Sequence, residues 1–290
     1  MVLKGIIAAV QNLYILTWDV GLFTFNLLTP NLKPGHVVPE GHPGARGSWP
    51  EYIAPKEGDS RCSCPALNAL ANHGVLPRDG KSISLRELTR TVRAAYNFSP
   101  SFCYFVPLYC ARMLGKDYNQ DAVDLSELDL HNGIEHDASL TRQDKYHEPN
   151  QGTPYIPYIE ELLASSSGKA LDGSALLTPD DLARFSAKRR TEAASSNPEF
   201  SLDCIHKIFG SSNSSTMLTI MGGRVKDLES FLIEERIPDG WESRVLSRKG
   251  LTFQAFNKTV IKVECKTRNL TNKAKKEKTV RATVLRYLLG

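Results

Sequence analysis

The stretch RCSCPALNALANHGVLPRDG, residues 61–80, predicts a short helix that begins directly after a cysteine. Pro65 suits the first turn of a helix, where the N–H that proline lacks has no intrahelical partner in any case. Leu67 and Leu70 give this helix an apolar face, and Gly74 marks its end. Cys64 then stands at the helix N-terminus, where the helix dipole favours negative charge.

This position favours the thiolate form of Cys64 over the thiol. Free N–H groups of the first turn point toward the sulfur, and those of Leu67 and Asn68 are the natural donors. A single thiolate on an otherwise apolar helix suits haem iron better than zinc, which requires four ligands. The alternative is a structural cysteine that happens to precede a helix, and this segment alone leaves both interpretations open.

A second segment, NGIEHDASLTRQD over residues 132–144, carries Glu135, His136 and Asp137 in succession. Adjacent residues do not share a helix face, so we expect a loop or helix end with these side chains directed different ways. The carboxylate of Glu135, the hydroxyl of Ser139 and a backbone carbonyl form an oxygen-rich set that Mg²⁺ or Ca²⁺ prefers. Asp137 can orient the imidazole of His136 for proton transfer. A solvated acidic turn is the alternative.

The rest of the body is predicted to be mainly helical. Ser84 and Glu87 form a capping box ahead of one amphipathic helix, and Pro179 occupies the first helical position of another. A third helix is expected over residues 225–236, and a small β-hairpin is expected near residues 251–264.

The N-terminal residues 5–28 are apolar enough and long enough to cross a membrane. Asp19, near the middle, argues against a span, because a carboxylate there costs about 2.5–3.5 kcal/mol. A membrane anchor or interfacial helix, a signal peptide, and a soluble helix packed on the body all remain open. Residues 31–60 hold five prolines and five glycines and predict a loop-like arm.

Composition and charge exclude several classes of protein. With 290 residues, 41% hydrophobic and 23% charged, the chain is neither disordered, collagen-like nor a multi-span membrane protein. The net charge of +4 divides into +7 from residue 266 onward and −3 in the rest. We therefore expect no nucleic-acid partner for the body, and a solvated or disordered basic tail that contacts anionic headgroups if the N-terminal segment meets a membrane.

The two segments together resemble the fungal haem-thiolate peroxidases, the family that contains chloroperoxidase and the unspecific peroxygenases. The family pattern of Pro-Cys-Pro followed by an ALNALANHG-type helix appears here with Cys64 and Pro65, and ALNALANHG is intact over residues 66–74. Glu-His-Asp-x-Ser appears as residues 135–139, and the NP-x-F stretch as residues 197–200. Two long motifs in the right order make the resemblance specific, over about residues 38–245.

The resemblance implies that Cys64, in a segment completed by Pro65, Ala66 and Leu67, is the proximal thiolate ligand of haem b. It also implies that Glu135, the Ser139 hydroxyl and the His136 carbonyl hold a Mg²⁺ or Mn²⁺ beside a haem propionate. His136 would lie on the distal side of the haem, steered by Asp137.

The chain departs from the family pattern at two positions. Ser63 replaces the first proline, which shapes only the approach to the ligand. The family's distal acid-base glutamate falls on Asn213, and an amide cannot take a proton from peroxide. Either His136 transfers the proton or turnover is slow; Glu192 and Glu199 are weaker candidates to replace the glutamate.

The fold expected is a single-domain, chloroperoxidase-like helical bundle around haem. Its parts are an apolar helix or anchor over 1–30, the arm over 31–60, the haem-thiolate domain over 61–245 and an extension with the basic tail over 246–290. The function expected is a peroxidase or peroxygenase that uses hydrogen peroxide to oxidise or oxygenate a small organic substrate, such as an aromatic compound of fungal secondary metabolism. A haloperoxidase, and a haem-binding auxiliary protein impaired by Asn213, are the alternatives. An intracellular, membrane-associated location is favoured over secretion, and the oligomeric state is not indicated.

Overall fold

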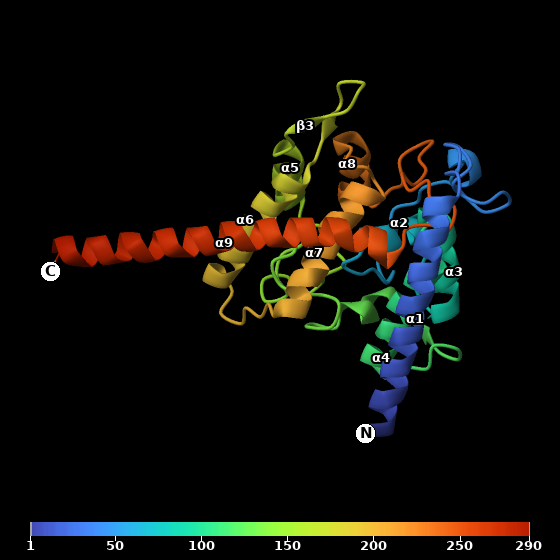
Figure 1. Ribbon diagram of the computed structural model, residues 1–290, viewed down its shortest axis with the longest axis horizontal. Coiled ribbons are helices and arrows are strands. Elements are labelled where there is room, and N and C mark those ends of the chain that lie inside the picture. Colours follow the sequence, from blue (N-terminus) through green and yellow to red (C-terminus); the bar gives the residue numbers. More distant parts are fainter. Residues whose placement is uncertain (1, 290) are drawn as a thin grey trace.

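The computed structural model describes the backbone of residues 2–289 and the side chains of residues 5–274, 276 and 277. Nine α-helices account for most of this range (Figure 1). They are α1 (Val2–Leu28), α2 (Pro65–Asn72), α3 (Leu85–Tyr96), α4 (Pro100–Leu114), α5 (Ile156–Ala164), α6 (Pro179–Ser196), α7 (Cys204–Thr219), α8 (Val225–Ile233) and α9 (Phe253–Leu289). The expectation of a mainly α fold is confirmed.

The strands in the described range form two short antiparallel pairs. β1 (Ile83–Ser84) pairs with β2 (Ala122–Val123), and β3 (Gly168–Lys169) pairs with β4 (Ala175–Leu176). Two short 3₁₀ helices, Ala45–Gly47 and Leu125–Asp129, lie in the loops. The arm before α2 otherwise has no regular structure, as its proline and glycine content predicted.

The local signals for α3 and α6 are confirmed. The hydroxyl of Ser84 accepts the N–H of Glu87 at 3.1 Å, which satisfies one free donor at the start of α3. Thr178 and Asp181 form a reciprocal capping box at the start of α6, with Pro179 at its first position. α8 ends at Ile233, three residues before the boundary expected from the sequence.

The hairpin expected near residues 251–264 is wrong, because Phe253 begins the long helix α9 instead. Phe256, Val260 and Val263 are buried at helical spacing and pack α9 against α6 and α7. The basic tail continues this helix rather than forming a disordered end. The side chains of Lys275 and of residues 278–289 lie outside the described part of the chain.

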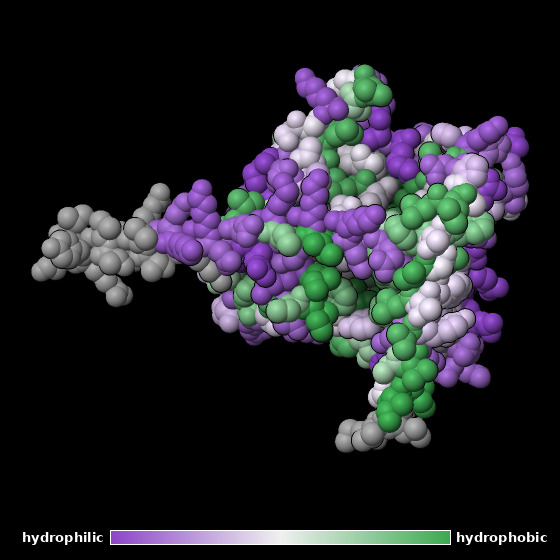
Figure 2. Space-filling view, viewed as in Figure 1, coloured by the Kyte–Doolittle hydropathy of each residue, from purple (hydrophilic) through white to green (hydrophobic). Residues whose placement is uncertain are grey.

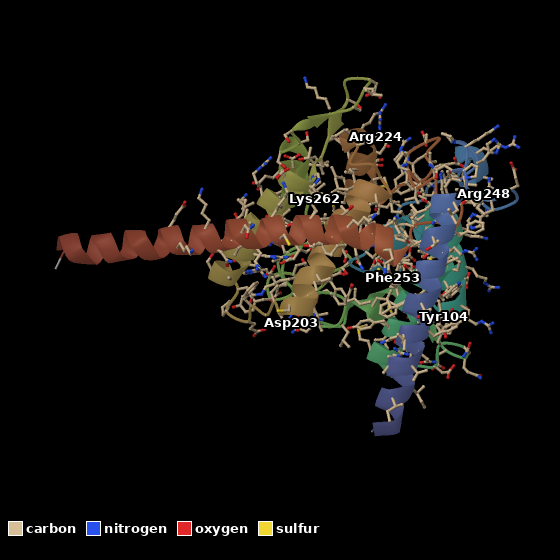
Figure 3. The ribbon with its side chains drawn as sticks, viewed as in Figure 1. Tyr104, Asp203, Arg224, Arg248, Phe253 and Lys262 are labelled. Atoms are coloured by element: carbon tan, nitrogen blue, oxygen red, sulfur yellow. The ribbon has the colours of Figure 1, made fainter. Side chains whose placement is uncertain are left out.

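The core lies between the helices that follow the arm. Side chains of α2, α3, α4, α5, α6 and α8 and of the first turns of α9 form one buried apolar cluster. Cys103 and Cys110 of α4 are buried and unbridged within it, as core residues. In Figure 1, α9 crosses in front of α6 and α7, and α1 lies in front of α4. Figure 3 shows how densely the side chains fill the space behind these two helices.

Candidate active site

Cys64 is the N-cap residue of α2, as predicted, with extended backbone angles of φ −89° and ψ 104°. Burial raises the pKa of its thiol above the ordinary value, and the nearby backbone N–H groups of Leu67 and Ala66 offset only part of this rise. The Cys64 side chain accepts no capping hydrogen bond, so neither Leu67 nor Asn68 is confirmed as a donor to the sulfur, and the raised pKa favours the thiol rather than the expected thiolate. The N–H of Asn68 donates to the carbonyl of Cys64 at 3.2 Å, because it already belongs to the helical pattern.

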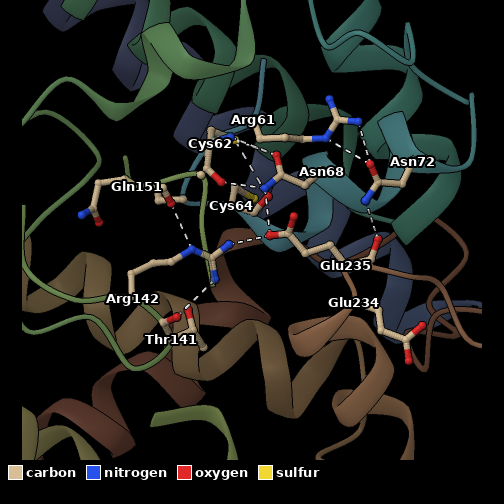
Figure 4. Close-up of polar contacts among 12 residues, drawn as sticks. Arg61, Cys62, Cys64, Asn68, Asn72, Thr141, Arg142, Gln151, Glu234 and Glu235 are labelled. Atoms are coloured by element: carbon tan, nitrogen blue, oxygen red, sulfur yellow. Dashed lines mark hydrogen bonds and ion pairs between the residues drawn. The ribbon is translucent and has the colours of Figure 1, made fainter. Parts of the chain in front are cut away.

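The side chain of Asn68 fixes the backbone just before Cys64 (Figure 4). Its Oδ1 accepts the N–H of Cys62 at 3.0 Å, and its Nδ2 donates to the Cys62 carbonyl at 2.6 Å. Nδ2 also donates to Oε1 of Glu235 at 2.8 Å. All three residues are buried, so these contacts replace water for groups that burial would otherwise leave unpaired.

Glu235 connects this segment to a loop far away in the sequence. Its carboxylate forms an ion pair of 2.5 Å with Arg142, and its carbonyl accepts from Nδ2 of Asn72 at 3.1 Å. Asn72 in turn accepts two bonds from the guanidinium of Arg61, at 2.7 and 3.0 Å. Burial raises the pKa of Glu235, while Arg142 lowers it. Glu235 and Arg142 belong to no local sequence motif, so no pattern in the sequence indicates their role.

Cys64 is more accessible than the other cysteine of the same segment. Cys62 is 1% exposed, whereas Cys64 is only partly buried. Burial raises the pKa of Cys62 well above its ordinary value, so it stays a thiol. A partly buried cysteine at a helix N-terminus, where the helix dipole favours negative charge, fits a thiolate ligand for iron better than the fully buried Cys62 does.

Glu135 has one carboxylate oxygen with a partner and one without. Oε2 lies 2.7 Å from Nδ1 of His131, whereas Oε1 is buried and has no hydrogen-bond partner. Burial raises the pKa of this carboxyl. An orphaned, buried carboxylate oxygen fits a cation ligand. The Ser139 hydroxyl accepts the N–H of Thr141 at 3.3 Å, and no cluster of three His, Cys, Asp or Glu side chains suited to a metal occurs in the described residues.

His136 is buried and faces α7. Its Nδ1 lies 2.8 Å from the carbonyl of Asp137, and its ring packs against Gly210 and against His206, with 6.4 Å between the two imidazole centroids. A Cβ on Gly210 would come within 3.2 Å of the His136 ring, so glycine allows this approach. Burial lowers the pKa of His136 to about 4, which keeps the ring neutral at neutral pH.

The carboxylate of Asp137 does not steer His136, contrary to the expectation; the backbone carbonyl of Asp137 does. One carboxylate oxygen accepts the N–H of Ser201 at 2.8 Å, and the other is buried without a partner. The three side chains of residues 135–137 therefore diverge, as expected for adjacent residues in a loop.

The NP-x-F stretch supports this loop. Nδ2 of Asn197 donates to Asp144 at 3.1 Å, and Asp144 accepts the N–H of Ala138 at 2.9 Å. Ala138 has a positive φ of 62°, a strained backbone for alanine. Arg189 of α6 donates to the carbonyl of Ser139 at 3.1 Å. Tertiary contacts thus bring the second and third motifs together.

Asn213 lies on α7, seven residues after His206 and three after Gly210, so it belongs to the helix face that meets His136. Its side chain is exposed. Of the alternative carboxylates, Glu192 pairs with Arg189 at 3.0 Å. Neither His206 nor Gly210 was singled out from the sequence, because only the approach of α7 to the 135–139 loop gives them a role.

A continuous series of aromatic rings leads from the core to His136. Phe102 of α4 stacks on Phe253 of α9 with 4.4 Å between centroids, and Phe253 contacts Phe105. The series continues through Tyr109 and Phe209 to His206. The surroundings of His136 are therefore apolar and aromatic on this side. A separate cavity of about 380 Å³ lies at the other end of α2, beside His73, and Cys64 does not line it.

The sequence is similar to known peroxidases. The profile of the family described as "Peroxidase, family 2" matches residues 50–246. Chloroperoxidase of Leptoxyphium fumago is 36% identical over 116 residues, which are 39% of this chain and 30% of that protein. The dothistromin biosynthesis peroxidase dotB of Dothistroma septosporum is 29% identical over 165 residues, 51% of this chain and 38% of that protein.

An aromatic peroxygenase of Cyclocybe aegerita is 28% identical over 208 residues, 63% of this chain and 52% of that protein. The chain thus spans only about a third to a half of the length of these three relatives. The family match, in contrast, covers the larger part of this chain and includes Cys64, the 135–139 loop and Asn213.

Proposed function

The chain belongs to peroxidase family 2, and from this premise we propose that it is a haem-thiolate peroxidase or peroxygenase that oxidises or oxygenates a small organic substrate with hydrogen peroxide. The observation that carries the proposal is the position of Cys64, a partly buried cysteine at the N-cap of α2, with proline in the first turn of the helix. Haem b, when bound, supplies an iron that activates peroxide, and a thiolate ligand supplies electron density for cleavage of the O–O bond.

The chain's own part on the proximal side is to hold Cys64 in position. Asn68 fixes the backbone of Cys62, and Glu235 holds Asn68 through a buried bond. The N–H groups of Ala66 and Leu67 stabilise negative charge on the sulfur. This rigid support is what a metal ligand requires to keep its orientation.

His136 is the proposed proton acceptor. If its Nδ1–H donates to the Asp137 carbonyl, the lone pair lies on Nε2, which is then the atom that can take a proton. Gly210 leaves space for the ring, and Asn213 on the same face of α7 offers an amide that can donate a hydrogen bond but cannot accept the proton as a base does.

The cation site is proposed from Glu135. Its orphaned oxygen, together with the His136 carbonyl and the Ser139 hydroxyl, offers oxygen ligands for Mg²⁺ or Mn²⁺. The substrate class rests on the aromatic series beside His136 and on the names of the relatives, one of which acts in dothistromin biosynthesis. An aromatic compound of secondary metabolism is therefore proposed, with peroxide as the second reactant.

Asn213 favours a second candidate function, a haem-binding auxiliary protein with impaired peroxide activation. Halide oxidation is a third, supported only by the name of the chloroperoxidase relative. We also propose that residues 5–28 associate with a membrane, and this proposal does not depend on the peroxidase chemistry.

An absorption spectrum tests the proposal. The full chain, purified with ample haem supply, reduced and exposed to carbon monoxide, is expected to show the strongly red-shifted Soret band of thiolate-ligated haem. Cys64→Ala should abolish this band, and the matched variant Cys62→Ala should keep it. A folded chain that binds no haem contradicts the proposal. Peroxide-dependent oxidation of an aromatic substrate, compared with bromide oxidation, then separates the candidate functions.

A further inference from the structure

The helix α1 has one face that is fixed to the body through polar side chains. Asp19 is fully buried and accepts the hydroxyl of Ser101 at 2.5 Å and the N–H groups of Phe253 and Gln254 at 3.1 and 3.2 Å. One turn earlier, Ile15 is also fully buried. The carboxylate therefore caps α9 while it holds α1 in place.

Further polar residues of α1 serve the same attachment. Arg112 of α4 donates to the amide oxygens of Asn12 and Gln11 at 3.1 and 2.6 Å. Near the other end, Asn26 donates to the carbonyl of Gly250 and accepts the N–H of Lys249, at 3.0 and 2.8 Å. The polar residues that interrupt the apolar segment are thus directed at the body.

The opposite face of α1 is apolar and exposed. Leu13 is 67% exposed, and its neighbours at helical spacing are similarly open to solvent. The exposed large apolar side chains of α1 are Ile6, Ile7, Val10, Leu13, Tyr14, Leu16, Val20, Phe25, Leu27 and Leu28. Figure 2 shows green hydrophobic residues toward both ends of α1, with residues of intermediate hydropathy between them. This polarity is the reverse of that of an ordinary surface helix, whose apolar side faces the core.

The attachment along the whole of α1 decides how the helix can meet a bilayer. The segment Gly5–Leu28 has the length and hydropathy of a membrane span. Only 11% of its apolar window is buried against the body, so most of that window is open to solvent. To cross a membrane, α1 would have to give up the contacts that its Asp19 and Asn26 make with the body and its bonds from Arg112. A helix that keeps these contacts presents its side, not its end, to the lipid.

Basic side chains border the apolar face. The ammonium group of Lys249 lies 4.9 Å from the ring centre of Phe25, and that of Lys258 lies 5.0 Å from the ring centre of Phe23. Lys262, on the next turn of α9, is exposed. In Figures 1 and 2, α1 and the first half of α9 share one side of the molecule, with hydrophilic residues over α9.

A cavity of about 520 Å³ lies beside this face, between α1, α3 and α4. Arg90 and Arg93 line it together with Tyr14, Trp18 and Tyr104, and no Asp or Glu occurs among the described residues of the lining. Two arginines and three aromatic residues in one lining suit a phosphate attached to an apolar chain.

We propose that the exposed face of α1 docks on the surface of an anionic phospholipid bilayer, with the helix lying in the plane of the interface. Lys249 and Lys258 contact the anionic headgroups, and the cavity lined by Arg90 and Arg93 takes one lipid phosphate. Apolar area and electrostatic attraction to anionic lipid act together in such interfacial binding. The inference rests on the membrane association proposed above and not on the peroxidase chemistry.

Flotation of the haem-loaded full chain with lipid vesicles tests this proposal. Binding is expected to be stronger to mixed phosphatidylcholine and phosphatidylserine vesicles than to phosphatidylcholine alone. Leu13→Glu should weaken binding to both by about tenfold or more, because an apolar contact is replaced by a charge. Lys258→Ala should weaken binding to the anionic vesicles alone, by about fivefold. Leu171→Glu, at an exposed leucine away from α1, is the matched control and should leave binding unchanged.

Other outcomes overturn the proposal. Equal flotation of the wild-type chain and Leu13→Glu would show that the face is not the contact. A dimer in solution that Leu13→Glu converts to a monomer would show that a second copy covers the face. Release by detergent but not by alkaline carbonate would indicate a span. The carbon monoxide spectrum of each variant reports haem ligation separately, so loss of flotation with a normal spectrum concerns docking alone.

Discussion

The side chain of Asn68 binds both backbone polar groups of Cys62, at 3.0 Å to its N–H and 2.6 Å to its carbonyl. These bonds determine the path of the chain as it approaches Cys64. The asparagine of the helix motif therefore acts through the backbone of a neighbouring residue, and the conformation of the proposed ligand depends on it.

Asn68→Ala is expected to lower the free energy of unfolding by about 3 kcal/mol, since it leaves two buried groups of Cys62 and one oxygen of Glu235 short of a partner. It should also weaken the red-shifted carbon monoxide band. Asn72→Ala is the comparison, because Asn72 contacts Arg61 and the Glu235 carbonyl rather than Cys62. Urea unfolding should show that both variants are destabilised, whereas the spectrum should change only in Asn68→Ala.

Arg142→Met is expected to lower the free energy of unfolding by about 3–5 kcal/mol at neutral pH, because the buried carboxylate of Glu235 loses its cation. The cost should be smaller at mildly acidic pH, where the raised pKa of Glu235 lets the carboxyl become protonated. The double variant with Arg142→Met and Glu235→Gln should regain part of the lost stability. Arg268→Met, at an exposed arginine of α9, is the control, and an equal loss there would contradict the role of the pair.

The pKa of His136, lowered to about 4 by burial, predicts a dependence of stability on pH. Folding favours the neutral ring, so its contribution is fully present above the ordinary pKa of 6.5 and is lost as the pH falls toward 4. The loss from this group between pH 7 and pH 4.5 should be about 2 kcal/mol. Urea unfolding of the wild-type chain and of His136→Gln at both pH values measures this loss. If the free energy of unfolding falls by the same amount in both proteins between the two pH values, His136 does not contribute.

Asn213→Glu is expected to raise the peroxide-dependent rate by about 10²–10⁴, the range that a positioned acid-base group supplies. Such a rise would mean that the natural chain is impaired in peroxide activation. An unchanged rate would indicate that His136 or another group already transfers the proton. Ser212→Glu, one residue away on a different part of the helix surface, is the matched control and should leave the rate as it is.

Asp19→Ala is expected to lower the free energy of unfolding by about 2 kcal/mol, because the N–H groups of Phe253 and Gln254 lose their acceptor in a buried site. Hydrogen exchange at the first turn of α9 should become faster. Asp239→Ala removes an exposed carboxylate and serves as the control. Unchanged exchange in Asp19→Ala would contradict the capping role.

Local patterns along the chain were sufficient to place Cys64 at the start of a helix and residues 135–137 in a loop. A proline in the first helical turn and three adjacent ionisable residues affect only the backbone a few positions away. Their spacing in the sequence is therefore enough to predict the local structure. The same holds for the caps of α3 and α6.

Contacts between distant parts of the chain were beyond the reach of such patterns. Glu235 meets Asn68 across 167 positions, and Asp19 meets Phe253 across 234. The expected hairpin near residues 251–264 was wrong for this reason, since the partner that caps the helix lies in a remote segment.

The sequence alone determined the helical class, the two motifs and the place of Cys64 at the start of a helix, because short-range sterics, capping and periodicity settle these. Only the tertiary structure decided that the Asp137 carbonyl rather than its carboxylate meets His136, and that α1 turns its apolar side outward. Both depend on where separate elements pack, and packing is chosen by the burial of the whole chain rather than by any one segment.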